Sequence, residues 1–220
     1  ARSLVWGSVW DSTRDAEISP RVFVDLALSN IAHETESTTV RTVLGQLALT
    51  VRNYLAPDKR QETIGAVAEA LWALAMNAAP GSDIQFQLVK AFSSFASAPE
   101  HQSTLRGLLE GAIALQGLSI DQDLRWELLA GLSLAGDTDR KEIEGELAKD
   151  NTANGAQAAA RARALLPSVE DKQRVFDELV GPDSPPNAIV SALSMSFAIS
   201  HTPENLEPFI GAYFDRLESL

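Results

Sequence analysis

His33 and Glu34 are the residues that come nearest to a metal-dependent catalytic pattern in this chain. A hydrolytic zinc site on a helix uses the pattern H-E-x-x-H, because residues four apart lie on one face and the glutamate can act as a base. Ser37 stands where the second histidine would be, and His101 and His201 are far away in the sequence. We therefore predict no metal site and no cofactor in this chain.

The usual signatures of nucleophilic catalysis and nucleotide binding are also missing. The sequence contains no G-x-S-x-G, no G-x-G-x-x-G and no G-x-x-x-x-G-K-[ST] pattern. It contains no cysteine, which excludes disulfides, thiolate metal sites and cysteine nucleophiles and fits a reducing cytoplasm. We therefore predict no catalytic residue in this chain and a cytoplasmic location.

The charge balance narrows the range of partners. Asp and Glu number 30 against 18 Lys and Arg, so the formal net charge is -12. A surface this negative repels phosphate backbones and anionic lipid headgroups, so we expect neither nucleic acid nor a membrane as a partner. No apolar run approaches the roughly 18 to 20 residues that cross a bilayer.

The stretch from Asp121 to Asp150 concentrates negative charge, with nine acidic residues against four basic ones. It is either a binding face for a cation or a basic partner, or a solvated face that keeps the protein soluble. A solvated face is the commoner role of such a charge run.

Arg125 and Trp126 stand next to each other within this stretch. A guanidinium can bind a carboxylate through two parallel hydrogen bonds. Arg125 can therefore either hold a carboxylate of a ligand or form a structural ion pair. Both alternatives are open from the sequence.

Trp6 and Trp10 lie four residues apart, so a helix places them on one face. They form either a recognition platform or an anchor that packs the first helix on the second. Arg14-Asp15 and Glu34-Thr35-Glu36 close the first two predicted helices. We expect an arginine–carboxylate bridge between these two ends.

Helical periodicity extends along almost the whole chain and positions these residues. Ile64, Val67, Leu71 and Leu74 recur at steps of three and four, which is the spacing of one helix face. No alternating run rich in β-branched and aromatic residues predicts a strand.

Hydroxyl residues mark the starts of several predicted helices. Ser19 precedes Pro20 and Thr202 precedes Pro203, and Ser168 precedes acidic residues. A serine or threonine at the N-cap and a proline in the first turn are typical helix starts, so we expect all three hydroxyls to cap.

Short loops of about 2 to 8 residues separate the predicted helices and favour antiparallel neighbours. Each pair spans about 35 to 40 residues, the period of helical-hairpin solenoids. We predict an all-α fold of about twelve helices, a right-handed superhelix of antiparallel hairpins like those of HEAT and armadillo repeats, with a globular bundle as the alternative. No linker requires two domains, so we expect one helical-repeat domain over residues 1–220. The predicted helices are 2–15, 20–33, 37–55, 57–79, 83–97, 99–114, 121–134, 138–149, 154–166, 169–180, 186–200 and 203–219.

The sequence also resembles a known family. The opening ARSLVWGSVWDSTRDAEISPRVFVDLALSNIAHETES is similar to the start of the C-terminal helical domain of aminopeptidase N-type zinc metallopeptidases. The D-L-R-W-E-L-L core at 123–129 and the D-x-T-A-x-G-A element at 150–156 resemble the actinobacterial branch of that family. The resemblance covers essentially the whole chain in order.

The resemblance implies a parent enzyme that removes N-terminal residues from peptides with a zinc ion held in an upstream catalytic domain. It implies that this chain is the C-terminal domain, a fragment without catalytic residues whose last hairpins are absent. Such a domain covers the active-site chamber and restricts peptide access. Its expected partners are the catalytic domain of the same polypeptide and peptide substrates.

Within that family the residues expected to contact the substrate chamber or the neighbouring domain are Arg125 and Trp126, with Arg14 behind them. An arginine on the concave face can hold a peptide carboxylate or an acidic side chain. The alternative function is a free-standing helical-repeat scaffold that binds a protein partner along its concave face.

Overall fold

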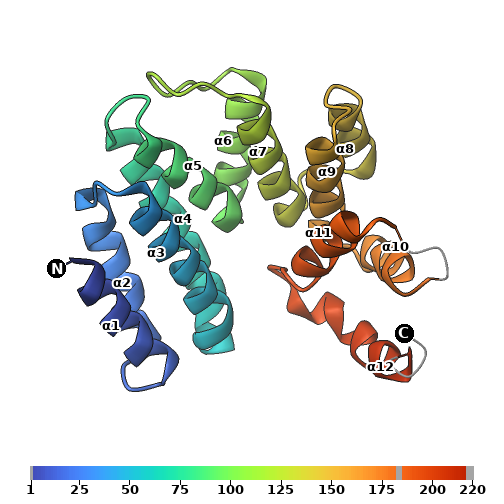
Figure 1. Cartoon of the computed structure of the whole chain (residues 1–220), viewed down its shortest axis with the longest axis horizontal. Helices are drawn as coiled ribbons and strands as arrows, with labels where there is room; N and C mark the ends of the chain where they lie inside the picture. Colours follow the sequence, from blue (N-terminus) through green and yellow to red (C-terminus); the bar gives the residue numbers. More distant parts are fainter. Residues whose placement is uncertain (1, 182–184, 217–220) are drawn as a thin grey trace. The chain divides into compact units, whose positions relative to one another are not determined.

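The structure is a computed structural model that describes residues 2–181 and 185–216 (Figure 1). In these residues it contains twelve α-helices, two 3₁₀ turns and one π-helical turn, and no strand. The prediction of an all-helical chain of about twelve helices is therefore confirmed. The right-handed superhelix and the single domain stay predictions.

The first of two compact units comprises Ala1–Ser97 and Ile113–Ser119. α4 packs on α5, and α3 packs on both α2 and α5. A 3₁₀ turn at Ile31–His33 follows α2, and a π-helical turn at Thr50–Tyr54 follows α3. The helices of this unit are α1 (Arg2–Arg14), α2 (Pro20–Asn30), α3 (Ser37–Leu49), α4 (Pro57–Asn77) and α5 (Asp83–Phe95).

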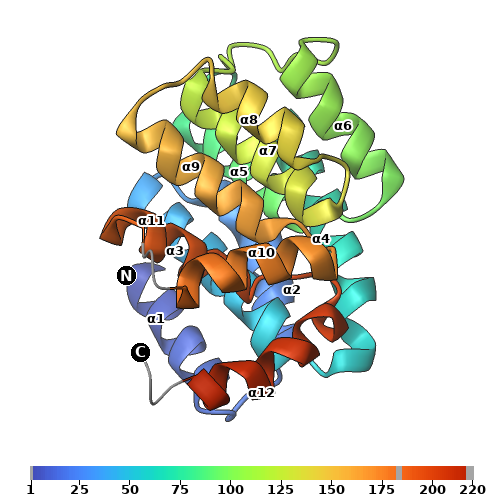
Figure 2. The ribbon, with the colours of Figure 1, turned by 90° about the vertical axis from the view of Figure 1, so that its right-hand side faces the viewer.

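The second unit comprises Ala98–Ala112 and Ile120–Leu220. α7 packs on α6 and α9, and α9 also packs on α8 and α11 (Figure 2). A 3₁₀ turn at Pro203–Leu206 precedes the last helix. The helices of this unit are α6 (Pro99–Glu110), α7 (Gln122–Ala135), α8 (Arg140–Leu147), α9 (Ala153–Leu165), α10 (Val169–Val180), α11 (Asn187–Phe197) and α12 (Glu207–Arg216).

Two of the three expected hydroxyl caps are wrong. Ser168 accepts a hydrogen bond from the backbone N–H of Asp171 at 3.0 Å and caps α10. Ser19 and Thr202 make no such bond, although a proline does follow each in the first helical turn. Proline lacks an N–H and has its φ fixed near the helical value, so it starts these turns without a capping side chain.

One predicted helix boundary is displaced by a glycine. The expected helix 99–114 ends at Glu110, because Gly111 adopts the left-handed conformation with φ of 79° and terminates α6. Gly117, where the break was expected, lies in the loop beyond. A Cβ on Gly117 would overlap the backbone of Gly81, so this loop needs glycine at both positions.

Two other predicted helices continue only in altered form. Helix 20–33 passes into the 3₁₀ turn after Asn30, and helix 37–55 passes into the π-helical turn after Leu49. The predicted helix 203–219 begins as the 3₁₀ turn, and its end at 217–219 lies outside the described residues.

Each unit has its own buried apolar side chains. In the first, Phe23, Val40, Leu47, Leu71 and Phe92 are fully buried. In the second, four alanines of α9 are fully buried, and their small side chains let the neighbouring helices approach closely. One cluster there groups Trp126, Leu129, Ile143, Ala159, Ala162 and Leu166.

Among the described residues, no helix combines the length and the apolar character that a membrane span requires.

Candidate functional site

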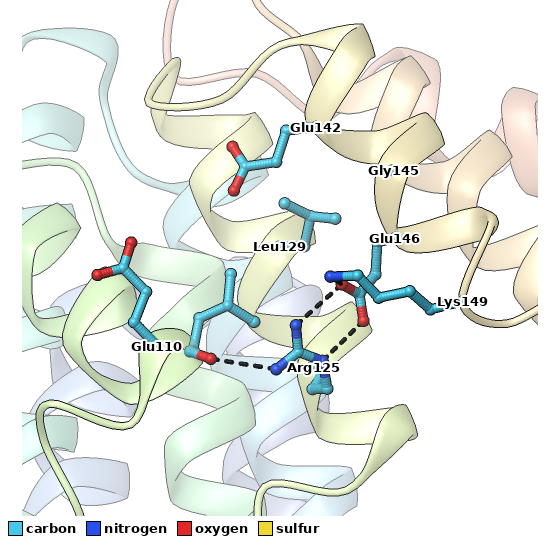
Figure 3. Close-up of a pocket in the computed structure, with 8 residues that line it drawn as sticks. Glu110, Arg125, Leu129, Glu142, Gly145, Glu146 and Lys149 are labelled. Atoms are coloured by element: carbon cyan, nitrogen blue, oxygen red, sulfur yellow. Dashed lines mark hydrogen bonds and ion pairs between the residues drawn. The ribbon is translucent and has the colours of Figure 1, made fainter.

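A pocket of about 450 Å³ lies in the second unit, on residues of α6, α7 and α8 and the turn after α8 (Figure 3). Its lining combines two leucines with five charged side chains. The residues that line it are Leu109, Glu110, Arg125, Leu129, Glu142, Gly145, Glu146 and Lys149.

Arg125 is the central cation of this pocket. Its Nε and Nη2 donate to the two oxygens of Glu146, at 2.7 Å and 2.9 Å, and its Nη1 donates to the backbone oxygen of Leu109 at 3.1 Å (Figure 3). The paired geometry is the strong form of an arginine–carboxylate bond. Arg125 therefore joins α7 to both α6 and α8, so of the two alternatives the structure shows the ion pair.

Glu146 is held by three donors and is almost fully buried, with 5% of its side chain exposed. Besides Arg125, Gln122 donates to it at 3.1 Å and Lys149 donates at 3.0 Å. The hydrogen bonds from Arg125 above all, together with those from Lys149 and Gln122, outweigh burial and lower the pKa of Glu146 to about 2. The same contact raises the pKa of Arg125, so the pair stays ionised.

Trp126 is buried and belongs to the same apolar cluster as Leu129, which lines the pocket. Its indole Nε1 donates to Oδ2 of Asp150 at 2.8 Å. Thr152 donates to the other carboxylate oxygen at 2.8 Å and caps α9 by accepting from the N–H of Gly155. A Cβ on Gly155 would overlap Asp150, so only glycine fits there. The D-L-R-W and D-x-T-A-x-G segments are therefore two halves of one contact.

A second arginine lies beside the pocket on α6. Arg106 donates to both oxygens of Glu142, and to the carboxylate and the backbone oxygen of Asp137. Burial raises the pKa of Glu142, but hydrogen bonds from Arg106 and Thr138 outweigh it, so the pKa is lowered. Arg106 therefore ties α6 to the start of α8.

The comparisons with known proteins agree with this description. A family model described as the ERAP1-like C-terminal domain matches residues 1–220, the whole chain. The chain belongs to this family. It is also 34% identical over 219 residues to Aminopeptidase N from Streptomyces lividans. The alignment covers all of this chain and 26% of that protein, so the chain spans about a quarter of its relative's length.

Arginines hold two carboxylates of the pocket in their ionised form. Glu142 and Glu146 have lowered pKa values and accept hydrogen bonds from arginines, so neither is suited to act as a general acid or base. Among residues 2–181 and 185–216, no group of three or more His, Cys, Asp or Glu side chains is arranged to hold a metal ion.

The first unit contains the remaining sequence candidates. Arg14 is half exposed and pairs with Asp11 at 3.4 Å and Asp15 at 3.1 Å. Glu34 is buried and accepts from the indole of Trp6 at 2.8 Å. The expected bridge between Arg14-Asp15 and 34–36 is therefore wrong. Two antiparallel helices place the end of one beside the start of the other, and Trp6 is near the start of α1.

Trp6 and Trp10 act as anchors. Beside the bond from Trp6 to Glu34, the Trp10 ring lies 5.6 Å from Phe23 and 6.0 Å from Tyr54 between ring centres. These contacts attach α1 to α2 and to the π-helical turn. The alternative of an anchor is thus the one that the structure shows.

The acidic residues between Asp121 and Asp150 make structural contacts within the second unit. Eight of the nine carboxylates accept hydrogen bonds from within the second unit, so this stretch is more than a solvated face. Glu146 and Asp150, the partners of Arg125 and Trp126, were missed, since they follow them by 21 and 24 residues and no local spacing relates them. The eight are Asp121, Glu127, Asp137, Asp139, Glu142, Glu144, Glu146 and Asp150.

Proposed function

We propose that this chain is the C-terminal helical domain of a zinc-dependent aminopeptidase, and that it covers the active-site chamber and restricts which peptides enter. The observation that carries the proposal is the family match over all 220 residues. The identity to Aminopeptidase N along the whole chain supports it. In this proposal the chain contributes no catalytic residue and does not hydrolyse peptides by itself.

The zinc ion of the proposed enzyme belongs outside this chain. The described residues do not fit it, because they bring no suitable set of ligands together and Ser37 replaces the second histidine after His33-Glu34. The catalytic domain of the same polypeptide is the proposed partner that holds the zinc, and the cytoplasm is the proposed location.

The pocket around Arg125 supports a role in holding peptides. About 27% of the Arg125 side chain and 64% of the Lys149 side chain are exposed. A peptide carboxylate or acidic side chain that enters the pocket can accept a bond from Lys149 while Arg125 stays on Glu146. Trp126 then acts by fixing α7 against Asp150, and Arg14, which is exposed, is a candidate contact to the catalytic domain.

Peptide-length preference in the full-length enzyme tests this role. We expect Lys149→Ala to lower kcat/KM for long peptides roughly fivefold, the worth of about 1 kcal/mol of a charge-assisted bond, and to leave small chromogenic substrates unchanged. Arg125→Ala should act in the same direction and also release Glu146. Arg161→Ala is the matched control, because Arg161 pairs with Glu127 and does not line the pocket. An equal response of long and short substrates to Lys149→Ala contradicts the role.

The reading frame that precedes Ala1 tests the function as a whole. An H-E-x-x-H pattern within a few hundred residues upstream supports the peptidase. Without it, the free-standing helical-repeat scaffold becomes the better explanation. Zinc content and aminopeptidase activity, measured on the full-length protein and on residues 1–220 alone, complete the test, and activity of residues 1–220 alone contradicts the proposal.

A further inference from the structure

A second and larger pocket, of about 610 Å³, lies in the second unit on α10, α11, the turn at Pro203–Leu206 and α12. We refer to it as the aromatic groove. Every side chain that lines it is apolar or aromatic except Ser194. Five of them are aromatic: Phe176, Phe197, Phe209, Tyr213 and Phe214.

The floor of the groove is packed and its outer wall is exposed. Phe209 is buried, and its ring centre lies 5.4 Å from those of both Phe176 and Phe197. On the same helix Ile210 is 60% exposed and Phe214 is 64% exposed. Phe209, Ile210, Tyr213 and Phe214 thus form an apolar stripe at steps of three and four along α12. A helix normally buries such a stripe against another element.

Acidic residues adjoin the lining of the groove in the sequence, and a cation that lies against a lining ring is the buried Lys172, whose Nζ lies 5.4 Å from the ring centre of Phe197. Four charged residues directly neighbour a lining residue in the sequence, and all four are negative: Asp177 and Glu178 on α10, and Glu207 and Asp215 on α12. α11, the third helix of the groove, carries no charged residue. A partner with basic residues beside an apolar face is therefore favoured, and one with acidic residues is disfavoured.

We propose that the aromatic groove is the docking site for an amphipathic helix of the same polypeptide that lies outside residues 1–220 and carries Lys or Arg beside its apolar face. This rests on the proposed function, which makes the chain part of a longer protein. Its relative has 74% of its length outside the aligned part, so ample chain is available to cover the groove. A helix laid in an apolar groove buries such a face at positions three and four apart.

A cysteine placed in the groove tests the proposal in the full-length protein: residues 1–220 contain no cysteine, and any cysteine elsewhere in the polypeptide is first replaced by serine. Ser194→Cys puts a thiol inside the groove. Met195→Cys is the matched control, since Met195 is the next residue on α11, is 78% exposed and does not line the groove. We expect the thiol at position 194 to react with a maleimide roughly tenfold or more slowly than the thiol at 195, because it reacts only when the covering helix opens.

A photo-crosslinker attached to the thiol at position 194 identifies the occupant. The expected product joins it to a peptide of the same molecule, outside residues 1–220, with apolar residues at helical spacing and basic residues beside them. Lysines at positions 207 and 215, introduced as Glu207→Lys and Asp215→Lys, should raise the reactivity of the thiol at 194. Equal reactivity of the two thiols in a monomeric protein overturns the proposal, as does a crosslink to residues 1–220 of a second copy.

These outcomes are separate from those of the proposed function. The thiol measurements need no peptidase activity, whereas the proposed function is read from substrate hydrolysis and zinc content. A covered groove in a protein without the zinc-binding pattern would support the docking site and contradict the peptidase function. An uncovered groove in an active zinc aminopeptidase would support the peptidase function and contradict the docking site.

Discussion

The two units of the chain connect their helices by different interactions. In the first, aromatic rings and aliphatic side chains make the contacts between helices, as in the Trp10–Phe23 and Trp72–Phe92 ring pairs. In the second, arginine–carboxylate pairs add to the apolar core and link helices that are one or two apart in the sequence. Those pairs are Arg106–Glu142, Arg125–Glu146, Arg140–Asp171, Arg161–Glu127 and Arg163–Glu144.

The difference predicts how each unit responds to its surroundings. Apolar contacts are non-directional and do not titrate. An ion pair fixes the register of two helices through its geometry, and it weakens when its carboxylate is protonated. We therefore expect the stability of the first unit to depend on how well its core is packed. The stability of the second unit should depend also on pH and on individual ionised side chains.

The largest effect is expected from Phe92→Ala in the first unit. Phe92 is fully buried, and its ring centre lies 5.2 Å from that of Trp72. Truncation leaves a cavity, which should lower the free energy of unfolding by about 4 kcal/mol. Urea denaturation at pH 7 and at pH 4 measures it, and the loss should be the same at both pH values. A loss that changes strongly with pH would contradict the apolar character of this unit.

The next effect is expected from Glu146→Gln in the second unit. The folded-state pKa of Glu146 is lowered to about 2 from 4.5. Its ionised form therefore contributes stability above pH 4.5 that is lost as the pH falls toward 2, about 3 kcal/mol in all. We expect the variant to be less stable than the parent by about that amount at pH 7, and the difference to shrink toward pH 2.

Glu170→Gln is the matched control for this prediction. Glu170 also pairs with an arginine, Arg174, but 76% of its side chain is exposed. Exposed pairs contribute little, so the control should change stability by less than about 0.5 kcal/mol. If Glu146→Gln and Glu170→Gln lower the free energy of unfolding by the same amount, burial does not make the Arg125–Glu146 pair more stabilising than an exposed pair.

A smaller effect concerns Lys172, a buried cation that makes no direct carboxylate bond within residues 2–181 and 185–216. Its Nζ donates to the backbone oxygens of Ala164 at 2.6 Å and Phe197 at 2.8 Å. Burial lowers its pKa to about 8, against a smaller opposing effect of Asp171. The folded state therefore binds fewer protons than the unfolded state between pH 8 and 10.5, so stability should rise with pH in that window.

Lys172→Met removes this titration. We expect the parent to gain about 2 kcal/mol relative to the variant between pH 7 and pH 10, as read from urea denaturation at each pH. Lys141→Met, at an exposed position of α8, should show no such gain. A stability difference between parent and Lys172→Met that is flat with pH would show that Lys172 is not destabilised as a buried ammonium.

The sequence predicted helices better than the contacts between them. Periodicity and proline positions depend on neighbours along the chain, and so the starts at Pro20, Pro57 and Pro99 are right. The end of the sixth helix was misplaced because Gly111 and Gly117 are equally plausible stops until their φ angles and the close approach to Gly81 are known.

The candidate site shows the same limit. Arg125 and Trp126 are recognisable from residue type, but their partners Glu146 and Asp150 come from a later helix and the turn after it. Nine carboxylates compete as partners in that stretch of sequence. The packing of α7, α8 and α9 decides which carboxylate pairs with Arg125 and which accepts the hydrogen bond from Trp126.

The smallest effect tests a buried carboxylate hydrogen bond within the first unit, a type of contact otherwise characteristic of the second unit. Trp6 donates to the buried Glu34 at 2.8 Å. Trp6→Phe keeps most of the ring but removes the donor, which should cost about 1 kcal/mol because a buried acceptor loses a partner. Trp10→Phe is the control, since the Trp10 ring contacts Phe23 and Tyr54 by packing. Trp6→Phe should lower stability more than Trp10→Phe does. Thermal unfolding of both variants compares them, and an equal loss would mean that α1 is attached by ring volume alone. In that case the first unit would depend on packing throughout, and the contrast between the units would be sharper than the structure indicates.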